Sequence, residues 1–240
     1  MDTYVLVHGA WHNGDLLKDV AEAIELDGHK VHLPTLKGNQ DGDSKNVGLD
    51  DAIDSLISYI NTNNIEDCIL VGHSYAGMVI TGAFDRLGKK FIKRLVYWNA
   101  FVPNPGESLN DMTPPEYISL FDQIVHKDGS VLLPFPIWRE AFINDGDLEL
   151  AQSTYEKLNP HPYKTFTDQI QLSQTPAEMQ VGKSYIVCQD DIALPASLPW
   201  HPRLSQKLGL YRLVSMPGSH ESCFTNPALL ARKMIEAGRD

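Results

Sequence analysis

The sequence predicts an α/β fold in which helices cover both faces of a mostly parallel, six-stranded sheet. Short apolar runs rich in β-branched residues alternate with amphipathic segments over the first hundred residues. Continuous apolar runs are typical of strands buried on both faces, and each right-handed crossover between parallel strands needs a helix of its own. With 240 residues, 42% of them hydrophobic, the chain can bury a large core without disulfides or a structural metal.

The N-terminal elements follow one another with short connections. The run Thr3–His8 reads as the first strand, and residues 16–26 read as a helix because Leu17, Val20 and Ile24 recur at helical spacing. Residues 30–33 read as a second strand, which Pro34 closes. The remaining strands are expected at 68–72, 95–98, 183–188 and 211–214, and the remaining helices at 49–60, 74–87 and 227–237.

The alternation breaks in the middle of the chain. Residues 102–180 hold most of the prolines and many scattered aromatic residues, without strand alternation. Such a segment has little periodic core of its own and must pack against something else. We therefore predict a core formed by residues 1–101 and 181–240, with residues 102–180 as a helical cap inserted over one edge of the sheet.

Composition excludes several classes of partner. The 31 acidic against 20 basic residues give a net charge of -11, which repels nucleic acid and anionic lipid. No apolar stretch is long enough to span a bilayer and no secretory signal is visible, so a cytoplasmic protein is expected. The three cysteines, Cys68, Cys188 and Cys223, are far apart and lack zinc-ligand spacing. No metal site is predicted.

The sequence Gly72-His73-Ser74-Tyr75-Ala76-Gly77 contains the pattern G-x-S-x-G. An apolar strand precedes it and a helix follows it, which is the context of a nucleophile elbow. A tight turn of this kind exposes the serine at the positive end of the helix, and the flanking glycines avoid clashes with neighbouring backbone. Ser74 is the predicted nucleophile.

A serine nucleophile needs a base oriented by a carboxylate, and both follow it in chain order. His220 lies after the last strand and before the last helix, where the base is expected. After the strand at 183–188 the sequence offers Asp190 and Asp191. Neighbouring residues point in different directions, so either could be the acid, and Asp191 is favoured. Backbone amides of Ala10 and Tyr75 are the expected oxyanion donors.

These motifs resemble the α/β-hydrolase superfamily, and within it a compact branch of plant methylesterases, hydroxynitrile lyases and bacterial pyrethroid-hydrolase-like carboxylesterases. The segments that carry the resemblance are 4–12, 28–31, 70–80, 100–103, 158–162, 165–167, 191–195 and 218–220. The match at Asp191-Ile192-Ala193-Leu194-Pro195 places the family's acid on Asp191. The resemblance also implies a sheet that lacks the two N-terminal strands of larger relatives.

Two positions separate the chemistries of this branch. Its lyases carry threonine where this chain has Gly9, and lysine where it has Glu221. The resemblance therefore implies a serine carboxylesterase for small or medium apolar esters, which needs no cofactor. The aromatic cap would line the substrate pocket, with Phe101, Tyr117, Phe121, Phe135 and Trp138 as candidates. Alternatives are a C–C bond hydrolase, a lactonase or cyclase in a biosynthetic pathway, or a ligand receptor on the same fold.

Overall fold

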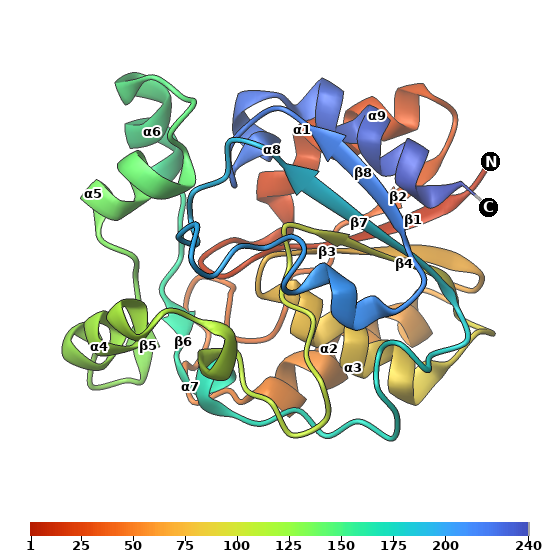
Figure 1. Cartoon of the computed structure of the whole chain (residues 1–240), viewed down its shortest axis with the longest axis horizontal. Coiled ribbons are helices and arrows are strands. Elements are labelled where there is room, and N and C mark those ends of the chain that lie inside the picture. The colour runs from red at the N-terminus through yellow and green to blue at the C-terminus, as the bar shows by residue number, and fades with distance from the viewer. Residues whose placement is uncertain (240) are drawn as a thin grey trace.

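The structure is a computed structural model that describes residues 1–239, and a parallel sheet of six strands lies at its centre (Figure 1). The strands stand in the order β2-β1-β3-β4-β7-β8, and each neighbouring pair is parallel. The bounds are β1 Thr3–Val7, β2 Lys30–His32, β3 Cys68–His73, β4 Ile92–Trp98, β7 Gly182–Cys188 and β8 Arg212–Met216. The predicted α/β fold with six strands is confirmed.

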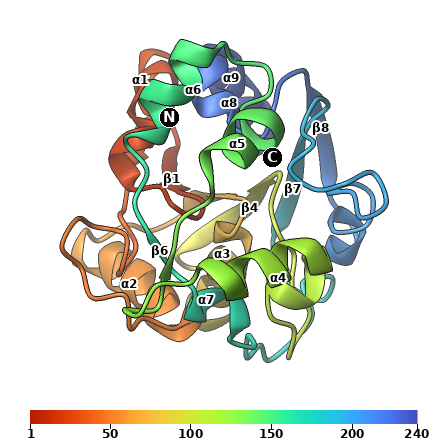
Figure 2. The same ribbon diagram turned by 90° about the vertical axis from the view of Figure 1, so that its left-hand side faces the viewer.

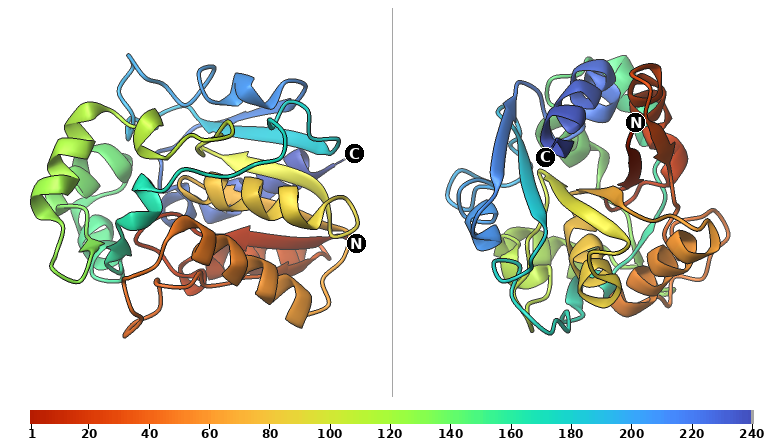
Figure 3. Two further views of the ribbon diagram at one scale, coloured as in Figure 1. Left: turned by 90° about the horizontal axis from the view of Figure 1, so that it is seen from below. Right: turned by 90° about the vertical axis from the view of Figure 1, so that its right-hand side faces the viewer.

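Helices cover both faces of this sheet (Figure 3). On one face, α1 and α9 pack against each other, and on the other α2 packs against α3. The bounds are α1 Lys18–Leu26, α2 Leu49–Thr62, α3 Ala76–Leu87, α8 Ser222–Thr225 and α9 Pro227–Gly238. Two apolar layers result, because β3 presents Leu70 to the layer of α2 and α3 and Val71 to the layer of α1 and α9. None of the helices in residues 1–239 is long and apolar enough to cross a bilayer.

Local chemistry explains the helix starts. A single 3-10 turn, η1 (Gly14–Leu17), precedes α1, and the Asn13 side chain caps it by accepting from the amide of Leu16. The helix expected from residue 16 therefore begins as a tighter turn. Asn226 caps α9 in the same way by accepting from the amide of Leu229, and Pro227 occupies the first helical position.

The helices between β4 and β7 lie beyond the carboxyl ends of the strands (Figure 2). This connection contains η2 (Asn110–Met112), α4 (Pro115–Ile124), β5 (Ser130–Val131), α5 (Phe135–Ile137), η3 (Trp138–Phe142), α6 (Leu148–Tyr155), β6 (His161–Pro162) and α7 (Lys164–Thr167). After α7 the chain runs back past α3 to the start of β7. β5 and β6 form a short antiparallel pair that the sequence did not indicate, because two-residue strands carry no alternation. Trp11 ties this segment to the core by donating from Nε1 to the carbonyl of Val131 at 3.0 Å. The cap boundaries at residues 102 and 180 stay a prediction.

Candidate active site

Ser74 occupies the turn between β3 and α3 in a left-handed backbone conformation, with φ of 54°. Non-glycine residues adopt this region rarely, and such strain gathers at functional sites. Three backbone hydrogen bonds hold the turn: the Ser74 amide donates to Trp98, and the Ser74 carbonyl accepts from Gly77 and Phe101. The serine side chain is thereby fixed at the carboxyl edge of the sheet.

The glycines around Ser74 are required by close approach. A Cβ on Gly77 would lie 2.0 Å from the carbonyl oxygen of Phe101, so no larger residue fits there. A Cβ on Gly9 would lie 2.9 Å from Nδ1 of His73 and 3.3 Å from Cβ of Ser74. The loop after β1 therefore runs directly against the serine, and a threonine at position 9 would press on it.

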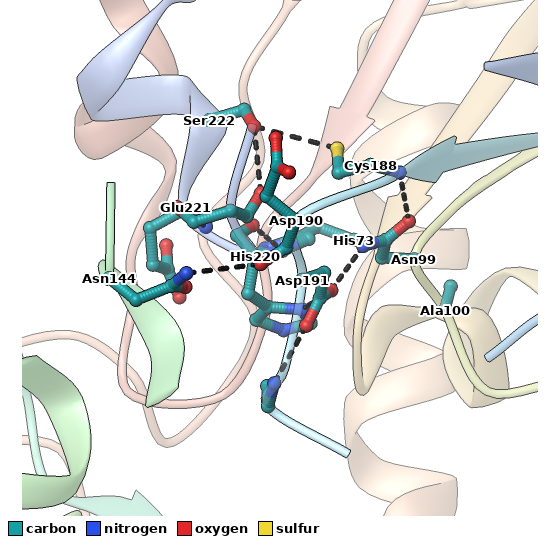
Figure 4. A network of polar contacts seen from close by, with 12 residues as sticks. His73, Asn99, Ala100, Asn144, Cys188, Asp190, Asp191, His220, Glu221 and Ser222 are labelled. Carbon is teal, nitrogen blue, oxygen red and sulfur yellow. Dashed lines mark hydrogen bonds and ion pairs between the residues drawn. The ribbon is translucent and has the colours of Figure 1, made fainter. Parts of the chain in front are cut away.

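His220 and Asp191 form a buried pair close to this turn (Figure 4). Nδ1 of His220 lies 2.6 Å from Oδ2 of Asp191, and their side chains are 1% and 0% exposed. The other carboxylate oxygen accepts the Ala193 amide at 2.8 Å, and the Asn99 side chain also donates to Asp191. Asp190, the alternative acid, points elsewhere: it is exposed and accepts the amide of Gly218 at 2.7 Å.

The environment of His220 favours a base. Burial alone would lower its pKa, but the charge and hydrogen bond of Asp191, together with the charge of Glu221, raise the pKa overall. Nε2 of His220 is buried and has no hydrogen-bond partner within residues 1–239. The ring stacks on Trp200 at 5.0 Å between centroids and meets Phe142 edge-on at 5.2 Å. The contact with Asp191 therefore occupies Nδ1 of His220 and leaves Nε2 free to exchange a proton.

A narrow apolar cavity of about 40 Å³ lies over Ser74. Phe101, Tyr117 and Phe121, three of the aromatic residues proposed for the substrate pocket, line it, and so do Ala10 and Tyr75, whose amides are the expected oxyanion donors. Its other lining residues are Trp11, Ser74, Leu109, Thr113, Phe142, Phe166, Ala193, Leu194 and Trp200. We call this cavity the inner pocket. Because Phe142 and Trp200 belong to its wall and also contact His220, the His220 ring lies directly behind that wall.

Phe135 and Trp138, expected in this wall, do not line the inner pocket. Trp138 is fully buried one layer further out, where its ring stacks on Phe142 and Nε1 donates to the carbonyl of Ala151. Phe135 packs edge-on against Tyr155 at 5.2 Å. Both aromatic side chains pack within the cap, so the structure does not place them in the wall of the inner pocket, and a role in substrate binding stays a prediction.

A wider groove of about 700 Å³, the outer groove, continues from the inner pocket. Tyr117 and Ala193 line both spaces, so they mark the junction. Most of the outer groove is apolar, and Glu116 and Glu140 contribute its two carboxylates. An elongated neutral molecule could therefore extend from Ser74 through the junction and along this groove.

Two histidines hold the backbone of the loop after β1. The Leu36 amide donates to Nε2 of His8 at 3.0 Å, so Nδ1 carries the proton and donates to the Gly9 carbonyl at 2.8 Å. His12 lies with Nδ1 2.7 Å from the carbonyl oxygen of Ala10. Burial lowers the pKa of His8 to about 4, although its bond to Gly9 opposes this. His8 is therefore neutral at physiological pH.

The lowered pKa of His8 predicts a loss of stability in acid. The unfolded chain takes up a proton as pH falls through about 6.5, whereas the folded chain does so only near 4. The stability from a neutral His8 is present above 6.5 and is lost as pH falls, by about 3 kcal/mol in all. Urea unfolding at pH 7 and 4 measures it. His8→Asn cannot titrate, so it should lose about 3 kcal/mol less; equal losses would contradict the assignment.

Glu221, directly after His220 in the sequence, does not line the inner pocket. Its carboxylate lies 3.0 Å from Nε2 of His12 and accepts a weak bond from Cys223. Potential metal ligands gather here as two overlapping buried groups, His12 with Glu221 and Cys223, and His73 with His220 and Glu221. Burial and the charge of Glu221 raise the pKa of the Cys223 thiol well above its usual value, so Cys223 is a buried, protonated thiol.

A profile of the Alpha/beta hydrolase family matches residues 4–233. The carbendazim hydrolyzing esterase of Nocardioides sp. (strain SG-4G) is 45% identical over 117 residues, which are 48% of this chain and 48% of that protein. The pyrethroid hydrolase of Sphingobium wenxiniae is 24% identical over 252 residues, covering 97% of this chain and 86% of that protein. The match to the first relative thus spans about half of its length.

A solved structure is similar over the whole chain. It is an extracellular α/β-hydrolase from a Paenibacillus species, described as sharing structural and functional homology with tobacco salicylic acid binding protein 2. The TM-score is 0.96 and the identity 32%, with 100% of both chains covered. The resemblance to the compact branch is confirmed. The chain belongs to the alpha/beta hydrolase family.

Proposed function

We propose that this protein is a serine carboxylesterase that hydrolyses small to medium, apolar, uncharged esters. The observation that carries the proposal is the position of Ser74: it sits in a strained turn beneath an apolar pocket, whose wall packs on the His220–Asp191 pair. The names of the relatives support ester hydrolysis, because two of them are an esterase and a pyrethroid hydrolase.

The proposed reaction proceeds through an acyl-enzyme. Ser74 Oγ attacks the ester carbonyl carbon while Nε2 of His220 accepts its proton, and Asp191 stabilises the imidazolium that forms. The amides of Ala10 and Tyr75 donate to the developing oxyanion. His220 then protonates the departing alcohol oxygen. In the second half, His220 activates a water that attacks the acyl carbon, Ser74 leaves with the proton, and the carboxylic acid is released.

The inner pocket and the outer groove suggest where the acyl and alcohol groups of an ester bind. The acyl carbon must reach Ser74, so we place the acyl group in the inner pocket, where about 40 Å³ admits a short chain. The alcohol group then extends past Tyr117 into the outer groove of about 700 Å³. Glu116 and Glu140 on the groove, and the net charge of -11, disfavour an anionic substrate.

Rates on p-nitrophenyl esters from acetate to octanoate test this division. We expect wild type to prefer short acyl groups and Phe121→Leu, which enlarges the inner pocket, to raise the hexanoate-to-acetate ratio of kcat/KM about tenfold. Phe135→Leu is the matched control, because Phe135 lies outside this pocket, and it should leave the ratio unchanged. An octanoate preference in wild type, or equal shifts in both variants, would contradict the placement. Absence of ester hydrolysis at every length would remove the proposed function.

A further inference from the structure

A buried contact between His12 and Glu221 joins two loops of the site. Nε2 of His12 lies 3.0 Å from Oε2 of Glu221, and each side chain is 1% exposed. The residues are 209 positions apart in sequence. His12 follows Ala10 by two residues, and Glu221 follows His220 directly. The contact therefore links the loop of a proposed oxyanion donor to the loop of the proposed base, and neither side chain lines the inner pocket.

The protonation state of the His12 ring follows from the groups that its two nitrogens contact. Nδ1 faces the carbonyl oxygen of Ala10 at 2.7 Å, and a carbonyl only accepts, so Nδ1 carries a proton. Burial alone would lower the pKa of His12, but the charge and hydrogen bond of Glu221 and the bond to Ala10 raise it overall. An imidazolium that donates to Glu221 from Nε2 and to Ala10 from Nδ1 satisfies both contacts.

Other titratable groups face the His12–Glu221 pair, but none of them acts as the counter-charge of the His12 imidazolium. Burial lowers the pKa values of His8 and His73, and burial with the charge of Glu221 raises that of the Cys223 thiol, so all three are uncharged. His220 also faces the pair, and its charge works against that of His12. In the resting enzyme His220 must be neutral to act as a base, which leaves Glu221 as the counter-charge of His12.

The His12 contact completes the fixation of the Ala10 backbone. His8 holds the carbonyl of Gly9, which belongs to the same peptide plane as the Ala10 amide. His12 holds the next plane through the Ala10 carbonyl. With both planes fixed, the φ and ψ angles of Ala10 are fixed, and so is the direction of its N–H. The following carbonyl, of Trp11, accepts from Asn159 at 2.6 Å.

We propose that His12 and Glu221 are positioning residues, which aim the Ala10 amide at the oxyanion by clamping its carbonyl to the His220 loop. The proposal rests on the proposed ester hydrolysis. Neither residue lines the inner pocket, so the pair positions the oxyanion donor through Ala10, and the charge of Glu221 in addition raises the pKa of His220. A preorganised N–H donor stabilises the transition state more than it stabilises the bound ester. If the Ala10 amide becomes less well oriented, kcat should therefore fall while KM stays nearly unchanged.

The sharpest test removes the pair as a whole. His12→Leu/Glu221→Leu leaves no buried charge unpaired, and such replacements often preserve or raise stability. We expect this double variant to fold and to lose kcat by about 10- to 100-fold, less than the loss of a whole oxyanion donor, with KM changed by no more than about twofold. Its affinity for an alkyl boronic acid, which mimics the tetrahedral intermediate, should fall in parallel with kcat.

His12→Asn/Glu221→Leu is the matched variant, because asparagine keeps an N–H that can reach the Ala10 carbonyl. It should recover only part of the lost kcat, because it restores the bond to the Ala10 carbonyl but not the link to the His220 loop. A double leucine variant with wild-type kcat, a loss confined to KM, or an asparagine variant no better than leucine would each overturn the proposal. Thermal unfolding of each variant separates these outcomes from a loss of folded protein.

A measurement on the wild-type protein does not depend on activity. ¹⁵N shifts of the His12 ring should report protons on both nitrogens at pH 7, and a singly protonated ring would overturn the ion pair. Wild type that hydrolyses no ester but shows a doubly protonated His12 would remove the proposed function and leave the pair intact. The two failures are therefore distinguishable.

Discussion

Ser74→Ala should reduce ester hydrolysis by about 10⁴-fold or more while leaving the fold intact. The alanine keeps the Cβ and the backbone bonds of the turn to Trp98, Gly77 and Phe101, and loses the attacking oxygen. Initial rates on p-nitrophenyl acetate, together with the mass shift after labelling by a fluorophosphonate, measure the effect. Wild type should gain one label, and the variant none.

Ser184→Ala is the matched control for that experiment. Ser184 is fully buried, but it lies on β7 and donates to the carbonyl of Ala237 at 2.7 Å, away from the pocket that Ser74 lines. Its loss should cost about 1 kcal/mol of stability and leave the rate unchanged. A Ser74→Ala protein that still hydrolyses esters and still takes the label would show that another residue is the nucleophile. It would thereby remove the proposed mechanism.

Asp191→Asn should lower kcat by about 10³- to 10⁴-fold, because an amide would donate to Nδ1 of His220 and leave the proton on the wrong ring nitrogen. The substitution also removes the charge that raises the pKa of His220. In wild type the rate should rise with pH through a pKa above about 6.5, since only the neutral ring accepts the proton. In the variant this acid limb should move to lower pH.

Asp190→Asn provides the comparison for the acid, one residue away. Asp190 is exposed, and its carboxylate serves the amide of Gly218. We expect kcat within about threefold of wild type and an unchanged acid limb. kcat/KM profiles from pH 5 to 9 for both variants give the answer. If Asp190→Asn were the damaging change and Asp191→Asn the mild one, the assignment of the acid would be reversed.

The sequence predicts those parts of the protein whose signals are local. The buried strands read as continuous apolar runs, and Ser74 stands out because a strand, a tight turn and a helix follow one another without a break. The choice between Asp190 and Asp191 was open on residues alone, because it depends on how the turn after β7 meets β8. Asn99, which donates to Asp191, carries no sequence signal beyond the tolerance of asparagine for its φ of 36°.

The pocket walls were harder to predict because they come from distant segments. Phe142 and Trp200 line the inner pocket, whereas Trp138 packs behind Phe142 and Phe135 against Tyr155. All of these are aromatic residues in a region without regular periodicity, so composition indicates a pocket but not which rings face it. The contact between His12 and Glu221 could not be predicted for a related reason, because a contact across 209 positions leaves no local pattern in the sequence.

The placement of the long segment between β4 and β7 has an evolutionary consequence. The two strands pair side by side, with Trp98 opposite Ile186, although about 80 residues separate them. A parallel crossover needs only about a dozen residues, and each doubling of a flexible connection costs only about 0.6 kcal/mol. Lengthening this connection therefore costs little free energy of folding. One contiguous stretch of the gene can be exchanged between relatives to change the substrate range. Ser74, Asp191 and His220 are encoded outside it and would be inherited unchanged.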